Sequence, residues 1–202
     1  MVKYFTLIII LVLLINCPKK VPNLLNGDIV FQTSLSPQSK AIQLATNSKY
    51  SHMGILYEDH GNYYVYEAIE SVKSTKLEEW IKRGEHGHYV VKRIRNANKI
   101  LTPEILRKMK EIGDGFKGKN YDLYFEWSDE RLYCSELVWK IYKRALNMEI
   151  GNLQNIREFD LSHPIVQPKI KERYGNNLPV DGVVISPSQM FNSDHLIEVY
   201  SN

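Results

Sequence analysis

Short apolar runs separated by turn residues dominate the first half of the chain. The runs at 53–57 and 63–68 are rich in β-branched and aromatic residues, and the polar stretch at 58–62 between them has the composition of a hairpin loop. Similar runs predict strands at 29–31, 89–94, 180–186 and 196–200. The pattern therefore predicts several short strands, two of them joined in a hairpin.

Apolar residues at helical spacing predict helices at 37–46, at 77–83, after residue 102 and after residue 133. Thr102 is a good N-cap and Pro103 suits the first helical position, so the third of these helices has a defined start. The last helix is expected to bury a stripe made of Leu137, Val138, Ile141 and Ala145. Its opposite side is expected to expose Lys140, Lys143 and Arg144 to water.

The predicted hairpin brings a histidine and a carboxylate together. With a turn centred between Asp59 and His60, His52 lies directly opposite Glu67. Directly opposed residues have Cβ atoms about 4.5–5.5 Å apart, which lets an imidazole and a carboxylate form a hydrogen bond. The pairing depends on the turn, because Gly61 can also host a bulge and a slip of one residue would move one partner to the other face.

Length and charge favour one globular domain over residues 24–202. The chain has 202 residues and a formal net charge of +3, which is enough length for a single core. Part of the positive charge belongs to Lys3, Lys19 and Lys20, before the expected domain. The composition therefore does not indicate a nucleic-acid partner.

The N-terminus has the polarity of an export signal. Lys3 precedes an apolar run at 5–15 that is short for a membrane span. Residues 14–17 (LINC) resemble a bacterial lipoprotein cleavage box, although Asn16 replaces the usual small residue, and Cys17 would be the lipidated residue. We expect a signal at 1–17 and a tether at 18–23, with lipidation, plain cleavage and an uncleaved anchor as alternatives. The protein is expected in the cell envelope or periplasm, held to the membrane by this segment.

Cys134 begins the last predicted helix, where helix dipole and free backbone N–H groups favour a thiolate. If Cys17 is lipidated or removed, Cys134 has no disulfide partner in an oxidising compartment, which is easier to understand if the thiol is used. A buried inert cysteine is the alternative. For a nucleophilic Cys134, His52 would hold and return the proton and Glu67 would orient the imidazole.

A thiol hydrolase also needs two hydrogen-bond donors for the oxyanion. The backbone N–H of Cys134 is one candidate, and the sequence offers Tyr133, Gln32 and Tyr50 as candidates for the second. This chemistry requires no metal and no organic cofactor.

Three other motifs favour simpler explanations. Residues 113–120 (GDGFKGKN) have phosphate-loop spacing, but Asn120 stands where Ser or Thr belongs and the segment follows a helix. His86 and His88 could ligate zinc, but no third ligand has a recognisable spacing. A group of aromatic residues could stack on nucleic acid or glycan, but core and cleft lining is the preferred interpretation: Tyr63, Tyr64, Tyr66, Tyr121, Tyr124 and Phe125.

Four segments in order, 26–32 (NGDIVFQ), 50–55 (YSHMGI), 65–68 (VYEA) and 133–138 (YCSELV), resemble the YiiX-like cysteine hydrolases of the NlpC/P60 superfamily. Residues 77–84 and 121–125 extend the resemblance, which covers about 24–142. These enzymes are circularly permuted papain-like hydrolases, in which the histidine precedes the cysteine. The resemblance implies an α+β fold, with a small antiparallel sheet or half-barrel and the cysteine helix packed on it.

The resemblance also implies Cys134 as nucleophile, His52 as base and Glu67 as the polar third member. It fixes the chemistry at thiol-mediated acyl transfer but not the acyl donor. We expect cleavage of an amide in a peptide or cell-wall stem peptide. A lipid-directed esterase or acyltransferase with the same residues and a non-catalytic peptide- or glycan-binding module are the alternatives. The polar segment 147–177 matches no motif and is expected to pass over the site and select the substrate.

Overall fold

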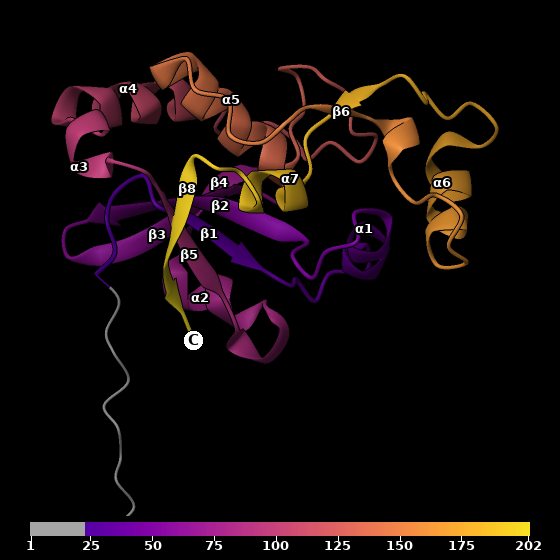
Figure 1. The fold of residues 1–202 in the computed structure, drawn as a ribbon, viewed down its shortest axis with the longest axis horizontal. Helices are drawn as coiled ribbons and strands as arrows, with labels where there is room; N and C mark the ends of the chain where they lie inside the picture. The colour runs from indigo at the N-terminus through magenta and orange to yellow at the C-terminus, as the bar shows by residue number, and fades with distance from the viewer. Residues whose placement is uncertain (1–22) are drawn as a thin grey trace, which may run out of the picture.

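The computed structural model describes residues 23–202, which form an α+β fold around one antiparallel sheet (Figure 1). The six strands lie in the order β4-β3-β2-β1-β5-β8. Their bounds are β1 Ile29–Gln32, β2 His52–Asp59, β3 Asn62–Ala68, β4 Val72–Lys76, β5 Val90–Ile94 and β8 Leu196–Ser201. The expected strands at 29–31, 53–57, 63–68, 89–94 and 196–200 are confirmed, whereas β4 has no counterpart among them.

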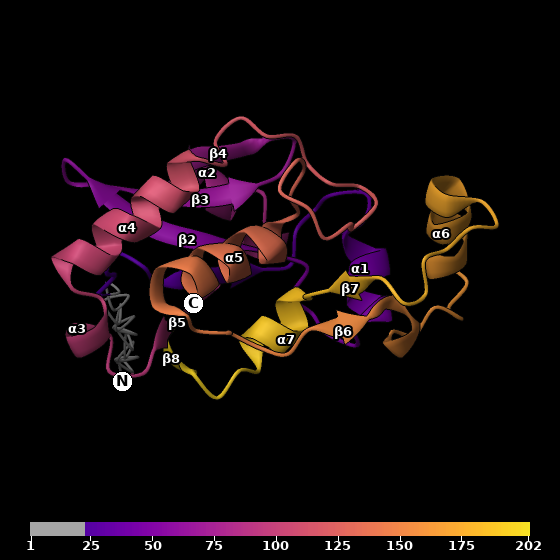
Figure 2. The same cartoon turned by 90° about the horizontal axis from the view of Figure 1, so that it is seen from above.

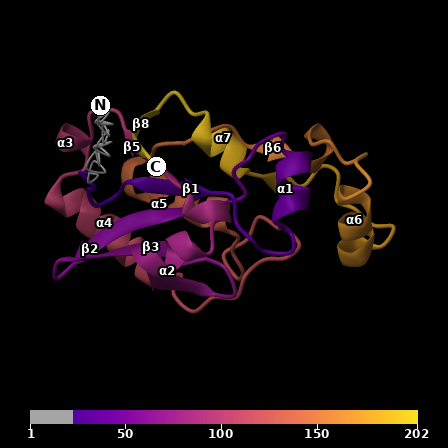
Figure 3. The same ribbon diagram turned by 90° about the horizontal axis from the view of Figure 1, so that it is seen from below.

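The helices cover the sheet unequally. Helices α4 and α5 cross one face and α2 lies on the other (Figures 1, 2 and 3). The helices are α1 Ser39–Ala45, α2 Leu77–Lys82, α3 Ala97–Ile100, α4 Pro103–Asp114, α5 Cys134–Leu146, α6 Val166–Tyr174 and α7 Pro187–Phe191. At the start of α4, the Thr102 hydroxyl accepts a hydrogen bond from the Ile105 N–H at 3.3 Å, which confirms the expected cap.

Alternation along the strands divides the core into two parts. Phe31, Met53 and Ile55 lie in the larger cluster with the buried face of α5, while Val30 and Leu56 pack with Trp80 of α2. Successive side chains of a strand point to opposite faces of the sheet, so a short run of apolar residues supplies both clusters. The cysteine helix is therefore packed on the sheet, as the resemblance implies.

The hairpin register differs from the predicted one. The turn is His60-Gly61, with φ of 50° and 81°, and the pairing runs from Asp59 opposite Asn62 to Ile55 opposite Tyr66. A two-residue turn with both central φ values positive matches the twist of the strands, which explains why the loop is shorter than expected. The prediction that His52 faces Glu67 directly is wrong. Glu67 lies across from Gly54, two residues along β2 from His52 and on the same face.

One expectation for α5 is also wrong. Lys140 is 5% exposed, and its Nζ lies 2.8 Å from Oε1 of Glu136 and 2.9 Å from Oδ1 of Asp129. The segment between α4 and α5, which contains Ser128 and Asp129, folds over this side of the helix, so the side that looked solvent-facing is covered. The predicted buried stripe is confirmed, since its four residues are all buried.

Residues 147–177 form an extension at one end of the molecule. The segment contains β6 (Gln154–Asn155), a single turn of 3₁₀ helix at Ile156–Glu158, and α6, which lies beside α1 (Figures 1 and 2). The expected strand at 180–186 is reduced to β7 (Val183–Val184), which pairs with β6. The expected signal at 1–17, Cys17 and most of the 18–23 tether lie outside the described residues. Within 23–202, every helix is too short or too polar to cross a bilayer.

Candidate active site

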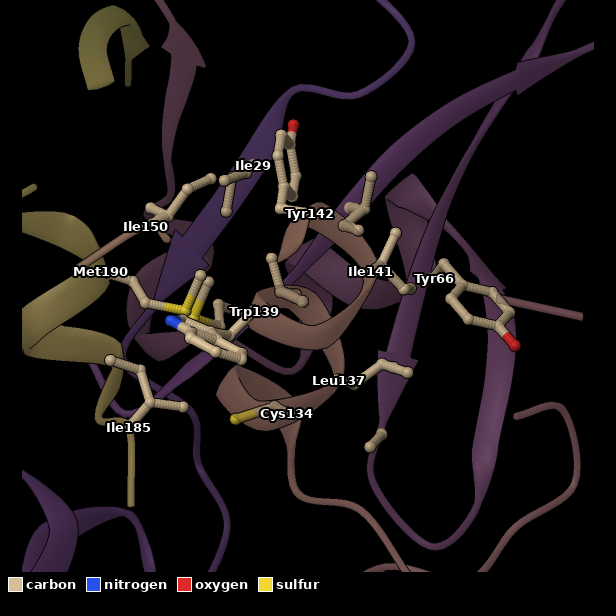
Figure 4. Packing of buried hydrophobic residues seen from close by; sticks show 14 of the residues in the cluster. Ile29, Tyr66, Cys134, Leu137, Trp139, Ile141, Tyr142, Ile150, Ile185 and Met190 are labelled. Atoms are coloured by element: carbon tan, nitrogen blue, oxygen red, sulfur yellow. The ribbon is translucent and has the colours of Figure 1, made fainter. Parts of the chain in front are cut away.

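Cys134 is the first residue of α5, preceded by Tyr133 in an extended conformation with φ −98° and ψ 166°. The side chain of the N-cap residue Tyr133 makes no capping hydrogen bond, so it leaves the first backbone N–H groups of the helix without the usual capping partner. Cys134 is 3% exposed, and Figure 4 shows it at the end of α5 beside Ile185. The thiol thus lies where the helix dipole favours a negative charge.

His52 and Glu67 form a buried pair on adjacent strands. Nε2 of His52 lies 2.6 Å from Oε2 of Glu67, and the two residues are 6% and 0% exposed. The imidazole also stacks on the indole of Trp80, with ring centroids 6.1 Å apart and an interplanar angle of 30°. The ring is therefore fixed at its face and at one nitrogen.

Glu67 is held at both of its oxygens. Oε1 accepts a hydrogen bond from the Thr75 hydroxyl at 2.5 Å and another from the guanidinium of Arg83. Burial raises the pKa of Glu67, but the hydrogen bond and charge of His52, together with Thr75 and Arg83, outweigh it and lower that pKa below its ordinary value. Glu67 is consequently a carboxylate at neutral pH. Sequence reasoning missed Thr75 and Arg83, because nothing in the pattern pairs them with Glu67.

His52 also reaches the thiol. Burial lowers the pKa of His52, but the interactions of its side chain with the nearby Cys134 and with Glu67 outweigh burial and raise that pKa to about 9. Because Nε2 is engaged by Glu67, Nδ1 is the nitrogen left for Cys134. The structure thus brings together the three residues singled out from the sequence, in the order Cys134, His52, Glu67.

A cavity of about 130 Å³ opens beside Cys134. Its wall comes from α1, α6, the segment before α5 and the residues around β7, and most of its lining is apolar: Ala41, Ile42, Phe125, Phe159, Leu161, Ile170, Leu178 and Ile185. Polar groups of Gln38, Tyr121 and Arg173 also line it. The cavity is therefore an apolar chamber with the thiol and a few polar groups in its wall.

The three side chains considered for the oxyanion have different surroundings. The Tyr133 hydroxyl accepts a hydrogen bond from the Ile185 N–H at 3.0 Å. The Gln32 amide is fully buried beside Gly84, and within residues 23–202 neither its oxygen nor its nitrogen has a hydrogen-bond partner. The Tyr50 ring stacks on Phe191 with centroids 4.2 Å apart. Of the three, only Tyr133 lines the cavity at Cys134.

Tyr121 is a residue that the sequence reasoning placed only in a general aromatic lining. Its hydroxyl accepts a hydrogen bond from Nε2 of Gln38 at 3.0 Å, and it lines the same cavity as Cys134. Backbone pairing between Tyr121 and Leu132 fixes it beside the start of α5. Burial first, and then the charge of nearby Cys134, raise the pKa of Tyr121 far above its ordinary value, so the hydroxyl keeps its hydrogen.

The motifs set aside in the sequence have structural roles. Gly113 belongs to the last turn of α4, so the segment at 113–120 follows a helix, and a phosphate loop would follow a strand. Nδ1 of His88 lies 2.7 Å from the backbone oxygen of Asn202. No cluster of three or more His, Cys, Asp or Glu side chains suited to a metal ion occurs between residues 23 and 202.

Comparison with known proteins agrees with this geometry. The model of the permuted papain-like amidase family YaeF/YiiX, C92, matches residues 23–200. YiiX of Escherichia coli K12, described as an uncharacterized protein, is 47% identical over 192 residues, covering 95% of this chain and 94% of YiiX. A crystal structure described as metalloprotein yiiX from Escherichia coli O157:H7 is 48% identical, with a TM-score of 0.83 over 88% of this chain and 97% of that one. By sequence and by fold, this chain belongs to the YaeF/YiiX family of permuted papain-like amidases, an enzyme family of cysteine hydrolases.

Proposed function

We propose that this protein cleaves an amide bond through an acyl-enzyme on Cys134, with His52 as the base and Glu67 as its orienting partner. The observation that carries the proposal is the buried pair in which Oε2 of Glu67 lies 2.6 Å from Nε2 of His52, with Cys134, at the N-terminus of α5, close enough to raise the pKa of His52. Each member has the position its task requires.

In the first step, Sγ of Cys134 attacks the carbonyl carbon while His52 carries the thiol proton. The tetrahedral intermediate then collapses, the C–N bond breaks, and His52 delivers the proton to the leaving amine. Water, deprotonated by His52, attacks the thioester, the C–S bond breaks, and the carboxylic acid leaves, which restores the thiolate of Cys134 beside the protonated imidazole of His52. Glu67 stays ionised throughout and stabilises the imidazolium.

Two hydrogen-bond donors would stabilise the oxyanion. One is the backbone N–H of Cys134 at the open end of α5. For the second we favour the Tyr121 hydroxyl over Tyr133, Gln32 and Tyr50, because it lines the cavity and already accepts a hydrogen bond from Gln38, which leaves its own hydrogen available.

The proposal predicts that iodoacetamide alkylates Cys134 rapidly at pH 7 and that His52→Ala slows this reaction about 10- to 100-fold, because the imidazolium that stabilises the thiolate is lost. His52 keeps its proton up to a pKa of about 9. Since the charge of Glu67 contributes to that raised pKa, Glu67→Gln should move the corresponding step in the rate profile to lower pH. Mass spectrometry of the Cys134 peptide from the full chain measures each rate.

Glu70→Gln is the matched control, because Glu70 is exposed and its carboxylate forms an ion pair with Lys73, at 3.3 Å, and none with His52 or Cys134. Its profile should superimpose on that of the unmodified protein. An equal rate in His52→Ala, or labelling that begins only when the protein unfolds, would mean that Cys134 is an inert buried thiol.

Two classes of acyl group are candidates for the substrate. A peptide or cell-wall stem peptide is the first candidate, because the family is one of amidases and a peptide bond is an amide. The apolar lining of the cavity favours a second candidate, a lipid-like acyl group held as an ester or amide. If the cavity takes an acyl chain, kcat/KM for N-acyl amides and the matching esters should rise with chain length, whereas peptide amides should show no such trend.

We further propose export and membrane attachment through the N-terminal segment, with Cys17 as the lipidated residue. The support is the Lys3 and apolar 5–15 pattern in the sequence. A peptide, peptidoglycan or lipid would then be the partner, and nucleic acid would not. Cell fractionation checks this: Cys17→Ser should move the protein from the membrane to the soluble fraction.

The described residues do not fit a metal site in the proposed centre. A solved relative is described as a metalloprotein. In this chain, however, His52, Thr75 and the Arg83 guanidinium occupy the oxygens of Glu67, and a cation beside a guanidinium is disfavoured. No step of the proposed reaction passes through a metal.

A further inference from the structure

Arg173, in the last turn of α6, belongs to a chain of hydrogen bonds that ends beside Cys134. Its Nη2 donates to Oε1 of Gln38 at 2.6 Å, and Nε2 of the same amide donates to the Tyr121 hydroxyl at 3.0 Å. Resting on the function proposed above, we propose that Arg173 is a positioning residue, which fixes the Gln38 amide so that the Tyr121 hydroxyl keeps its hydrogen for the substrate oxyanion.

The chemistry of the three groups allows only one arrangement. A guanidinium donates hydrogen bonds and accepts none, so the amide atom facing Arg173 must be the oxygen. The amide nitrogen then faces Tyr121 and donates to it. A hydroxyl has one hydrogen, and because the Tyr121 oxygen is accepting from Gln38, that hydrogen is free to point into the cavity.

Without Arg173 the side-chain amide of Gln38 could rotate, so that its oxygen and nitrogen exchange places. A rotated Gln38 would present its oxygen to Tyr121 and accept the hydroxyl hydrogen, which would leave the tyrosine an acceptor toward the cavity. Arg173 therefore sets the direction in which the Tyr121 hydroxyl donates its hydrogen, and it does not set the position of the Tyr121 ring. The loss of Arg173 should consequently slow only a reaction in which an oxyanion forms.

Contacts of α6 hold the guanidinium in place. The Arg173 Cζ lies 5.2 Å from the ring centroid of Phe125, and the neighbouring Tyr174 hydroxyl donates to the backbone oxygen of Tyr124 at 2.5 Å. Both partners lie in the segment that carries Tyr121. The end of α6 is thus fastened to the same segment whose hydroxyl it orients, and the polar wall of the cavity is complete only with α6 seated.

Kinetics of Arg173→Met, Tyr121→Phe and the double variant test the proposal, with an N-acyl amide as substrate. Tyr121→Phe should lower kcat about 100-fold, as loss of one oxyanion donor does. Arg173→Met should lower kcat about tenfold with little change in KM, and Arg173→Lys should restore most of it. Because Arg173 acts only through Tyr121, the double variant should be no slower than Tyr121→Phe alone.

Two further variants sharpen the result. Gln38→Glu leaves only acceptor oxygens facing Tyr121, so its kcat should fall nearly to that of Tyr121→Phe. Lys171→Met, on the exposed side of the same helix, should leave kcat and KM unchanged. Multiplicative losses in the double variant, or a normal kcat in Arg173→Met, would overturn the proposal.

Alkylation by iodoacetamide separates this proposal from the function on which it rests. The reaction forms a C–S bond and releases iodide without an oxyanion, so Arg173→Met and Tyr121→Phe should alkylate at the rate of the unmodified protein. Slow alkylation in Arg173→Met would indicate a general disturbance of the site and overturn the positioning role. Failure of the proposed function has a different signature, because Cys134 would then react independently of His52 even with Arg173 present.

Discussion

Cys134→Ala is expected to lower amide turnover by about 10⁴-fold or more, the largest single effect in this protein. The sulfur forms the covalent bond of the acyl-enzyme, and the remaining groups can only polarise the substrate or position water. Removal of a small, 3% exposed side chain should leave the fold intact, so the circular dichroism spectrum should be unchanged. Steady-state rates with an N-acyl amide, and calorimetric binding of the same compound, measure the two properties.

Binding of that compound should survive the substitution, since the cavity wall is otherwise unchanged. This combination also separates the proposed hydrolase from a module that only binds. A binding module would show the same affinity in both proteins and no His52-dependent turnover in either. Substantial turnover by Cys134→Ala would exclude the thiol as nucleophile and direct attention to the other polar groups of the cavity.

The His52 and Glu67 pair shows how much of the site's geometry could be predicted from the sequence. The turn was predicted one residue too early, so the direct opposition of the two residues was wrong. The error displaced the partner by two positions, and a displacement of two keeps a side chain on the same face of a sheet. Diagonal neighbours on one face are still within reach of long side chains, which is why the contact exists at 2.6 Å despite the wrong register.

Other parts of the site depend on contacts that no local pattern encodes. Gln38 and Tyr121 are 83 residues apart, and Gln38 and Arg173 are 135 apart, so each pairing follows from how the sheet, α1 and α6 assemble. Lys140 shows the same limit. Its spacing is that of a solvated helix face, but the segment before α5 covers it and supplies Asp129 as a partner. Periodicity indicates which side of a helix is apolar and does not indicate what covers the other side.

Gly54→Ala is expected to have the largest effect on stability, about 3 kcal/mol or more of the free energy of unfolding. A Cβ at Gly54 would lie 2.7 Å from the backbone oxygen of Tyr66 and would overlap Cγ1 of Val65. Both neighbours belong to β3, and the backbone oxygen cannot move without moving the strand. The substitution would therefore push β2 and β3 apart at the place where His52 of β2 and Glu67 of β3 form their hydrogen bond.

Gly61→Ala is the control, because a Cβ there meets no atom of the described part of the chain within 4 Å, although φ is +81°. It should cost only about 1 kcal/mol, the ordinary penalty of a side chain in the left-handed region. Urea unfolding of both variants measures the difference. Gly54→Ala should also slow the His52-dependent alkylation of Cys134, whereas Gly61→Ala should not, since only the first disturbs the hydrogen bond from His52 to Glu67. Equal losses of stability in the two variants would contradict the close approach of β2 and β3, on which the geometry of the site depends.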